Sequence, residues 1–462
     1  MEKHDSNRLE AKLTKICEEA QLTGMALILS KHGRPIFQKY YGWRDVDNQH
    51  PVTSDTIFGA ASITKSLTAM AIMHLEDAGK LTAKDPVKQW IPEFSLPDHT
   101  YESDILIHHL LTHTSGLPGL PAVHAARLPS IMQDPDGSYL FDEMPENIDP
   151  ISTVSQLIDL LPELDFQMLG APGEVFNYSN EGFALLQEII ERASGERFTD
   201  YVKRYIFSPL DMKRSMFTTA DLQRFEDVTE LYAYEKARPA VFHSPAWWDV
   251  GGIHTNGSLK ISVADLMTYL EIFRRDGRVN GVRMLSENSL RKMTTPHVTT
   301  PNGTRYGYGL QIDALGEVQL IGHGGSIKGV SSNMQWAKET GITGAVLINI
   351  AGADAAGILK TAMGFVLGEY DEEGSVSTIN LTSDQQKKYV GHYRSDEGQS
   401  VRVSLVEGVL QLIDNKSQTP LKPIGNHQFL TGNNKTITFL PDQNQHITAI
   451  FTGMRQLQKT KD

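Results

Sequence analysis

The chain has 462 residues, of which 40% are hydrophobic and 21% are charged, and its formal net charge is -13. This length exceeds that of one ordinary domain, and the composition is typical of a globular protein, so we expect at least two folding units. The negative charge, and the lack of any run of five or six lysines and arginines, argue against nucleic acid as a partner.

Residues 1–24 mix acidic and basic side chains and lack the apolar core of a secretory signal. No apolar run reaches the roughly 18 residues that a bilayer-spanning helix needs. Cys17 is the single cysteine, which excludes an internal disulfide, and its apolar-periodic position in the first predicted helix favours a buried thiol over a nucleophile. We therefore expect a cytoplasmic protein without a membrane anchor.

Hydrophobic periodicity predicts the elements of the first 370 residues in chain order. A helix around Leu9–Cys17 precedes a hairpin of two strands, 25–30 and 35–41. Helices are then expected at 62–79, 181–194 and 263–274. Four short strands follow, at 306–312, 318–321, 332–336 and 344–349. Helices in the middle and strands at both ends predict one antiparallel sheet built from both ends of the domain.

The segment 117–165 is rich in Pro, Asp and Met and shows little periodicity. A long irregular insertion of this kind is either a lid or wall of the substrate site, or a mobile surface loop, and the sequence leaves both open.

An acidic stretch after Leu367, poor in apolar residues, is typical of a linker. We therefore expect a first domain at 1–375 and a second at 376–462. Six strands are predicted in the second: 389–393, 401–405, 409–413, 429–431, 436–440 and 447–451. This pattern indicates a small β-barrel or sandwich.

The first chemical signal is Ser62-Ile-Thr-Lys65, at the start of a predicted helix. One helical turn separates the hydroxyl from the amine, so both can face one cleft. A lysine can take the proton of a serine hydroxyl if burial or nearby charge lowers its pKa, and the helix N-terminus adds positive potential for an oxyanion. Alone, the motif is weak, because Ser62 could simply be a helix N-cap.

The second signal is Tyr178-Ser-Asn180, directly before the predicted helix at 181–194. A phenol can relay protons between nucleophile and leaving group, and an asparagine amide can hold both a lysine and a substrate carbonyl. The alternative is a half-buried aromatic residue followed by an N-cap asparagine.

The third signal is Gly322-His323-Gly-Gly-Ser326, after an apolar strand. A hydrogen-bonding side chain followed by small residues on a strand would let an extended substrate pair along the strand edge. The alternative is a glycine-rich turn with an incidental histidine.

Two further groups are weaker. His109 and His113 have a metal-like spacing, but no further ligand set accompanies them, so structural roles are favoured and we expect no metal or cofactor. Trp247 and Trp248 either line an acyl pocket, which we slightly favour, or fill a domain interface.

The three motifs, in this order, resemble the signatures of the penicillin-recognising serine hydrolases, the superfamily of class C β-lactamases and D-alanyl-D-alanine carboxypeptidases. The segments 110–118 and 306–310 are also similar to segments common in that family. The resemblance covers about residues 5–370, and the tail is similar to the lipocalin-like domain that many members carry. It implies an α+β, β-lactamase/transpeptidase-like fold, with an antiparallel sheet flanked by helices and a mostly helical subdomain, followed by a small all-β barrel.

By this resemblance, Ser62 would be the acylated nucleophile, Lys65 its base partner and Tyr178 the proton relay. Backbone N–H groups of Ser62 and Ser326 would bind the oxyanion. The resemblance places substrate-binding and oxyanion roles at five positions: Asn180, His323, Gly324, Gly325 and Ser326. One departure from the family is His323, which stands where true class C β-lactamases have lysine. Because histidine is mostly neutral near pH 7, this weakens the case for antibiotic hydrolysis.

The sequence thus predicts a serine hydrolase that acts on an ester, an amide or a D-residue-containing peptide through an acyl-enzyme at Ser62. Three alternatives stay open: acyl transfer or peptide cyclisation on the same scaffold, β-lactam hydrolysis, and a non-catalytic binding protein. The expected partner is a small-molecule or peptide substrate, and the sequence does not determine the oligomeric state.

Overall fold

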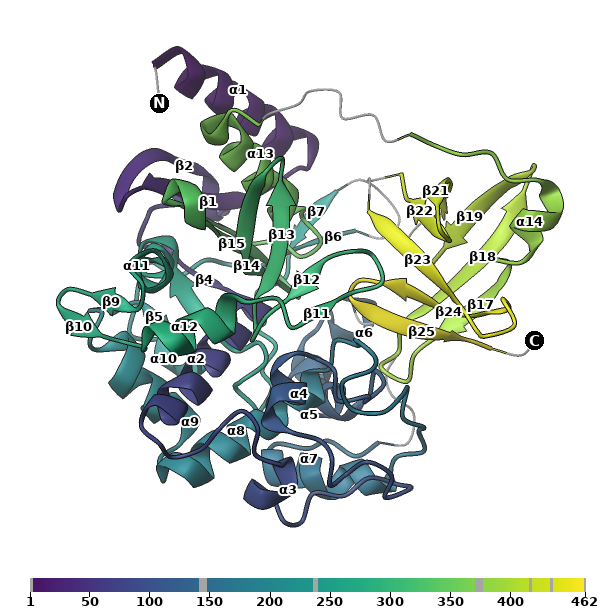
Figure 1. Cartoon of the computed structure of the whole chain (residues 1–462). Coiled ribbons are helices and arrows are strands. Elements are labelled where there is room, and N and C mark those ends of the chain that lie inside the picture. The colour runs from purple at the N-terminus through teal and green to yellow at the C-terminus, as the bar shows by residue number, and fades with distance from the viewer. Residues whose placement is uncertain are drawn as a thin grey trace.

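A computed structural model describes residues 3–140, 148–235, 240–369, 377–414, 418–432 and 435–460 (Figure 1). Its central feature is a nine-stranded sheet in which strands from both ends of the first 370 residues meet, as predicted. In spatial order the strands are β11 (Val298–Thr299), β12 (Arg305–Tyr306), β13 (Gln311–Leu315), β14 (Val318–Ile327), β15 (Val330–Ala337), β16 (Ile342–Ile348), β1 (Gly24–Lys31), β2 (Arg34–Asp45) and β3 (His50–Pro51). Each neighbouring pair is antiparallel.

Helices cover both faces of this sheet. The pair α1 (Lys3–Glu19) and α13 (Ala355–Leu367) packs on one face, and α11 (Val263–Arg274) packs on the other. Strand β16 is buried along its whole length because it lies between these layers. Cys17 is buried in the α1–α13 layer, where burial raises the pKa of its thiol to about 11, in agreement with an unreactive role.

A mostly helical region lies beside the sheet (Figure 1). Its helices are α2 (Thr64–Asp77), α3 (Val87–Trp90), α4 (Ile107–Leu111), α5 (Ala122–Gln133), α6 (Gly137–Leu140), α7 (Val154–Leu160), α8 (Asn180–Ser194), α9 (Phe198–Val202), α10 (Thr219–Leu222) and α12 (Glu287–Thr294). Three small sheets complete it: β4 (Ile57–Gly59) with β8 (Lys260–Ser262) and β5 (Ser215–Met216), β6 (Tyr232–Tyr234) with β7 (Val241–His243), and β9 (Arg278–Val279) with β10 (Val282–Arg283).

The C-terminal part forms a second nine-stranded antiparallel sheet, which we call the C-terminal barrel. Its order is β20 (Gln418–Pro420), β19 (Val409–Ile413), β18 (Ser400–Val406), β17 (Gly391–Arg394), β25 (Arg455–Lys459), β24 (Ile447–Thr452), β23 (Thr436–Pro441), β22 (Gln428–Leu430) and β21 (Lys422–Gly425). The two outer strands, β20 and β21, follow each other in the chain, so the sheet nearly closes. A short helix, α14 (Ser383–Lys387), precedes it. The predicted boundary between 375 and 376 lies outside the described residues.

Two expectations about local structure are wrong. The segment 117–165 is not irregular where the structure describes it, because it contains α5 and α7, whose apolar side chains are buried in the main core. The predicted strand 306–312 is divided into β12 and β13, because Gly309 turns with a φ of 62° where its backbone meets α2. A Cβ on Gly309 would lie 2.6 Å from the carbonyl oxygen of Lys65.

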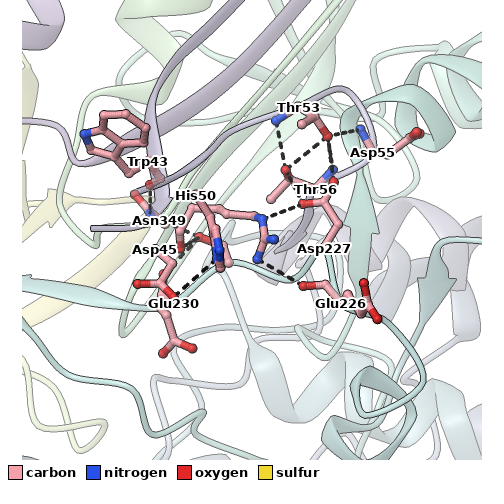
Figure 2. A network of polar contacts seen from close by, with 12 residues as sticks. Trp43, Asp45, His50, Thr53, Asp55, Thr56, Glu226, Asp227, Glu230 and Asn349 are labelled. Carbon is pink, nitrogen blue, oxygen red and sulfur yellow. Dashed lines mark hydrogen bonds and ion pairs between the residues drawn. The ribbon is translucent and has the colours of Figure 1, made fainter. Parts of the chain in front are cut away.

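A polar network fixes the segment that leads to Ser62 (Figure 2). The hydroxyls of Thr53 and Thr56 donate to the Asp227 carboxylate at 2.7 and 2.6 Å, and Arg44 forms an ion pair with the same carboxylate at 3.1 Å. Thr56 directly precedes β4, which runs toward Ser62. The network therefore ties the start of the candidate site to strand β2 of the main sheet, which carries Arg44.

Candidate active site

Ser62 lies in a single turn of 3₁₀-helix (Ala61–Ile63) between β4 and α2. The preceding residue, Ala61, has a φ of 46°, a left-handed conformation that a residue with a Cβ rarely adopts. The N-cap alternative for Ser62 is wrong, because the N-cap of α2 is Ile63 and no side chain caps it. Ser62 is instead held in a sharp turn with its side chain partly exposed.

Lys65 is fully buried, and its amine nitrogen lies 3.4 Å from the Ser62 Oγ. The same nitrogen donates to the Asn180 Oδ1 at 2.9 Å and to the Asn256 carbonyl at 2.7 Å. Burial, followed by the positive charges of Arg455 and Arg127, holds the pKa of Lys65 well below its ordinary value. No carboxylate forms an ion pair with it in the part of the chain that the structure describes.

Asn180 begins α8, but it is not the N-cap that one alternative proposed. Ser179 takes that role, with its Oγ accepting from the Gly182 N–H at 3.0 Å. The Asn180 amide is therefore free of the helix backbone and reaches Lys65.

Tyr178 is 6% exposed, so the alternative of a half-buried aromatic residue is also wrong. Its ring centroid lies 4.7 Å from the Lys65 amine, and the Ser62 side chain is close enough to act on its phenol. Burial raises the pKa of the phenol above its usual range, although the Ser62 side chain opposes this. The structure thus brings the first two sequence motifs together around one hydroxyl.

His113 supports this arrangement from behind, a role that spacing did not predict. Its ring lies 4.1 Å from that of Tyr178, and its Nδ1 accepts a hydrogen bond from the Ser179 N–H at 3.1 Å. Burial holds the pKa of His113 well below normal. Among the described residues, no group of three or more possible ligands could hold a metal ion.

The third motif lies within strand β14, whose backbone crosses the Ser62 turn. A Cβ on Gly325 would lie 2.3 Å from the Ala60 carbonyl oxygen and 2.8 Å from the Ser62 nitrogen, so only glycine fits there. Gly324 is partly exposed and Ser326 is exposed, so the strand presents its edge to solvent beside Ser62.

His323 is buried, with both ring nitrogens engaged inside the protein. Its Nδ1 lies 2.5 Å from the Gly324 carbonyl, which can only accept, so Nδ1 carries the proton. Its Nε2 therefore accepts from the Tyr306 hydroxyl at 3.1 Å. Burial lowers the pKa of His323 to about 3. This neutral imidazole provides no cation for a substrate carboxylate.

The C-terminal barrel adds a part of the site that the sequence motifs missed. Arg455, at the start of β25, places its guanidinium 4.9 Å from the centroid of the Tyr178 ring and forms a two-point ion pair with Glu397. The Glu397 carboxylate also accepts from the Asn180 Nδ2 at 3.3 Å. Sequence reasoning did not predict β25, because Arg455-Gln-Leu-Gln-Lys459 has one apolar residue and no strong strand signal.

Burial alone would raise the pKa of Glu397, but Arg455 outweighs it and the pKa falls to about 2. His124 lies 3.6 Å from the same carboxylate, yet burial lowers its own pKa, so we regard this contact as one to a neutral ring. Burial, then the charge of Glu397, raises the pKa of Glu181 to about 7. A buried layer of titratable side chains thus lies behind Asn180 and Tyr178. It consists of Glu397, His124, Glu181 and Arg127.

A cavity of about 510 Å³ opens beside Ser326. Trp248, Lys328 and Arg127 line it, and Arg127 comes from α5 in the segment 117–165. Trp248 donates to Asp134 at 2.8 Å, which fixes the indole. Trp247 and Trp248 both line a second, smaller cavity of about 20 Å³ beside Gly59 and Ala61, so the pocket interpretation is favoured for both tryptophans.

Comparisons with known proteins agree with this architecture. The family model described as Beta-lactamase matches residues 7–364. Esterase EstB of Burkholderia gladioli is 32% identical over 221 residues, which are 47% of this chain and 53% of that protein. The chain therefore matches only about half the length of that curated relative.

Solved structures extend the similarity to the whole chain. The octameric penicillin-binding protein homologue from Pyrococcus abyssi is 28% identical, with a TM-score of 0.71 over 98% of this chain and 99% of that one. The D-amino acid amidase from Ochrobactrum anthropi SV3, in complex with L-phenylalanine amide, is 25% identical, with a TM-score of 0.60 over 78% of this chain and 98% of that one.

The fold and the family match confirm the resemblance that the three motifs indicated, and the C-terminal barrel is compatible with it. Among the described residues, no helix has the length and apolarity to cross a membrane. The chain belongs to the Beta-lactamase family of penicillin-recognising serine hydrolases.

Proposed function

We propose that this protein is a serine hydrolase that forms an acyl-enzyme at Ser62 and releases the acyl group to water. The proposed substrates are esters and amides, including those of D-amino acids. The observation that carries the proposal is the set of contacts around the Lys65 amine. A neutral amine has two N–H donors and one lone pair, and Asn180 and Asn256 take the two donors. The lone pair is left facing the Ser62 hydroxyl at 3.4 Å.

Acylation follows from this geometry. Lys65 takes the Ser62 proton while Oγ forms a bond to the substrate carbonyl carbon. The carbonyl oxygen becomes an oxyanion, which in this proposal the N–H groups of Ser62 and Ser326 stabilise; the close approach of β14 to the Ser62 turn at Gly325 supports this. Breakdown expels the alcohol or amine, which takes a proton relayed by Tyr178 from Lys65.

Deacylation reverses these roles. Water enters at the exposed strand edge, and its proton passes to the Tyr178–Lys65 pair as its oxygen attacks the acyl carbon. Ser62 leaves with the returned proton, and the carboxylic acid is released. The cavity beside Ser326 is the proposed acyl pocket, with Trp248 as an apolar wall.

The relatives support hydrolysis of esters and amides. One is named an esterase and another a D-amino acid amidase. The neutral His323 argues against β-lactams as preferred substrates, because their carboxylate would meet no permanent cation at this position.

Intact-protein mass spectrometry tests the proposal. The wild-type chain and Ser62→Ala are incubated with p-nitrophenyl esters, with D- and L-amino acid amides and peptides, and with a penicillin. We expect an adduct of acyl mass on the wild type only, which disappears as product accumulates. Full turnover by Ser62→Ala would refute the mechanism. The absence of an adduct from every donor would favour a binding protein, and product analysis with an added amine separates hydrolysis from acyl transfer.

A further inference from the structure

The turn between β24 and β25 joins the C-terminal barrel to the segment that carries Tyr178. The Tyr178 N–H donates to the Met454 carbonyl at 3.0 Å. The Gln456 N–H donates to the Asn177 Oδ1 at 2.9 Å, and the Gln456 amide donates to the Phe176 carbonyl at 3.2 Å. The backbone before α8 is thus held by the barrel, which lies next to the helical region (Figure 1).

Glu397 determines how the Asn180 amide is oriented. An ionised carboxylate only accepts hydrogen bonds, so the amide must present its Nδ2 to Glu397 and its Oδ1 to Lys65. If the amide were reversed, an oxygen would face the carboxylate and a donor would face the amine. The second N–H of Nδ2 stays available for a substrate carbonyl. Glu397 is 5% exposed, so water screens this contact little.

Arg455 contacts Tyr178, the other functional residue of the Tyr178-Ser-Asn180 motif. Its guanidinium lies over the Tyr178 ring and is held in place by the two-point pair with Glu397, with only 14% of its side chain exposed. Removing one partner would leave the other charge buried without its counterion. Glu397 and Arg455 therefore hold each other in place. In addition, Glu397 orients Asn180 and Arg455 orients Tyr178.

We propose that the Glu397–Arg455 ion pair of the C-terminal barrel is a positioning element for proton transfer at Ser62, with Glu397 orienting Asn180 and Arg455 orienting Tyr178. The inference rests on the proposed function and deepens it. It means that the barrel completes the active site.

The charges of the pair also act on the proton carriers, with opposite signs. Arg455 lowers the pKa of both Lys65 and Tyr178, whereas Glu397 raises both. Other titratable or charged groups also face these two side chains: His113, His323, Arg127, Glu181 and Tyr306. None of these residues is substituted in the variants below, but the pKa of Glu181 moves with the pair, because Glu397 raises it and Arg455 lowers it. This response of Glu181 opposes the direct effect of each substitution on Lys65, so it reduces the size of the expected shift.

Single substitutions give a test with a predicted sign. The base must be deprotonated to act, so the acidic limb of the pH profile of kcat/KM follows its pKa. Arg455→Met removes a positive charge and should move this limb to higher pH, by about one unit. Glu397→Gln removes a negative charge and should move it to lower pH. Arg455→Lys should restore most of the wild-type limb.

A double variant covers the case in which the single variants do not fold. Glu397→Gln combined with Arg455→Met removes both charges together, and such replacements of buried pairs often preserve stability. We expect its kcat for an activated ester to fall about tenfold or more, with KM changed less than about threefold, because orientation is lost but the acyl pocket is intact. Asp384→Asn, at the exposed Lys387–Asp384 pair of the same C-terminal part, is the matched control and should behave as wild type.

The inference is overturned if both single variants fold and their limbs stay in place or move in the same direction. It is also overturned if the folded double variant keeps the wild-type kcat. These outcomes differ from failure of the proposed function, which would appear in the wild type alone as the absence of any Ser62 adduct.

Discussion

Two buried lysines near the cavity have opposite surroundings. Lys328 forms an ion pair with Asp134 at 2.8 Å, and the two side chains are 3% and 0% exposed. Lys65 is equally buried, but its partners are an amide oxygen and a backbone carbonyl, and nearby arginines add positive charge. Burial lowers the pKa of both amines, but the carboxylate of Asp134 opposes this at Lys328, whereas no ion-paired carboxylate among the described residues opposes it at Lys65. Burial of a lysine therefore indicates a catalytic base only where no carboxylate forms an ion pair with its amine.

The largest effect is expected from Lys65→Met. Loss of the base should reduce the rate of Ser62 adduct formation by at least about 10³-fold. Two effects act on the thermal midpoint: the variant no longer deprotonates a buried amine on folding, but the Asn180 amide oxygen and the Asn256 carbonyl lose a donor. Because the deprotonation cost of the wild type diminishes as pH rises toward the unfolded pKa, the midpoint of the variant relative to the wild type should fall as pH rises. Adduct mass followed over time measures the rate, and thermal melts at several pH values measure the midpoint. More than a tenth of the wild-type rate would show that Lys65 is not the base.

Asp134→Asn would break the pair at Lys328. It leaves a buried cation without its counterion, so we expect the free energy of unfolding to fall by roughly 3 kcal/mol in urea titrations. The double variant Asp134→Asn with Lys328→Met should recover most of that loss. If the double variant is no more stable than the single one, the pair is not what holds this region together.

Asn180→Asp would make the surroundings of Lys65 resemble those of Lys328. A carboxylate in place of the amide oxygen at 2.9 Å should raise the pKa of Lys65, so the acidic limb of kcat/KM moves upward by about one pH unit or more. The second oxygen would face the Glu397 carboxylate in place of the Asn180 Nδ2 donor, so the variant also loses that hydrogen bond. Activity near neutral pH should fall about tenfold and recover in alkaline buffer. Asn180→Ala is the matched control, since it loses the amide without adding charge. An unchanged limb in Asn180→Asp would contradict the proposed role of Lys65.

Lys260 offers the smallest expected effect on activity. It is buried, and burial lowers its pKa to about 8, but it donates to the Phe217 and Ser258 carbonyls. Lys260→Met should reduce stability by about 1–3 kcal/mol, because two buried carbonyls lose a donor. It should change adduct formation at Ser62 less than about threefold. A large loss of activity in a folded Lys260→Met variant would contradict this, because it would show that a buried lysine with no contact to Ser62 also takes part in catalysis.

Much of the fold could be predicted from local patterns. The helices around Leu9–Cys17, at 181–194 and at 263–274, and the first hairpin, are present because amphipathic periodicity and glycine caps act over a few residues. The segment 117–165 was misjudged because α5 is buried on several sides and includes Pro129, which masks its period. Strands β20, β21 and β25 were missed because they are short and polar.

The sequence by itself determined which residues are candidates for the site, since their types and order carry the family resemblance. They are Ser62, Lys65, Tyr178, Asn180 and residues 322–326. Only the tertiary structure decided their protonation and orientation. Burial and charges from distant segments lower the pKa of Lys65, and contacts with Tyr306 and Gly324 hold His323 as a neutral ring. The pairing of Asn180 with Glu397 could not be predicted from motifs, because it joins residues 217 positions apart and depends on how the barrel packs.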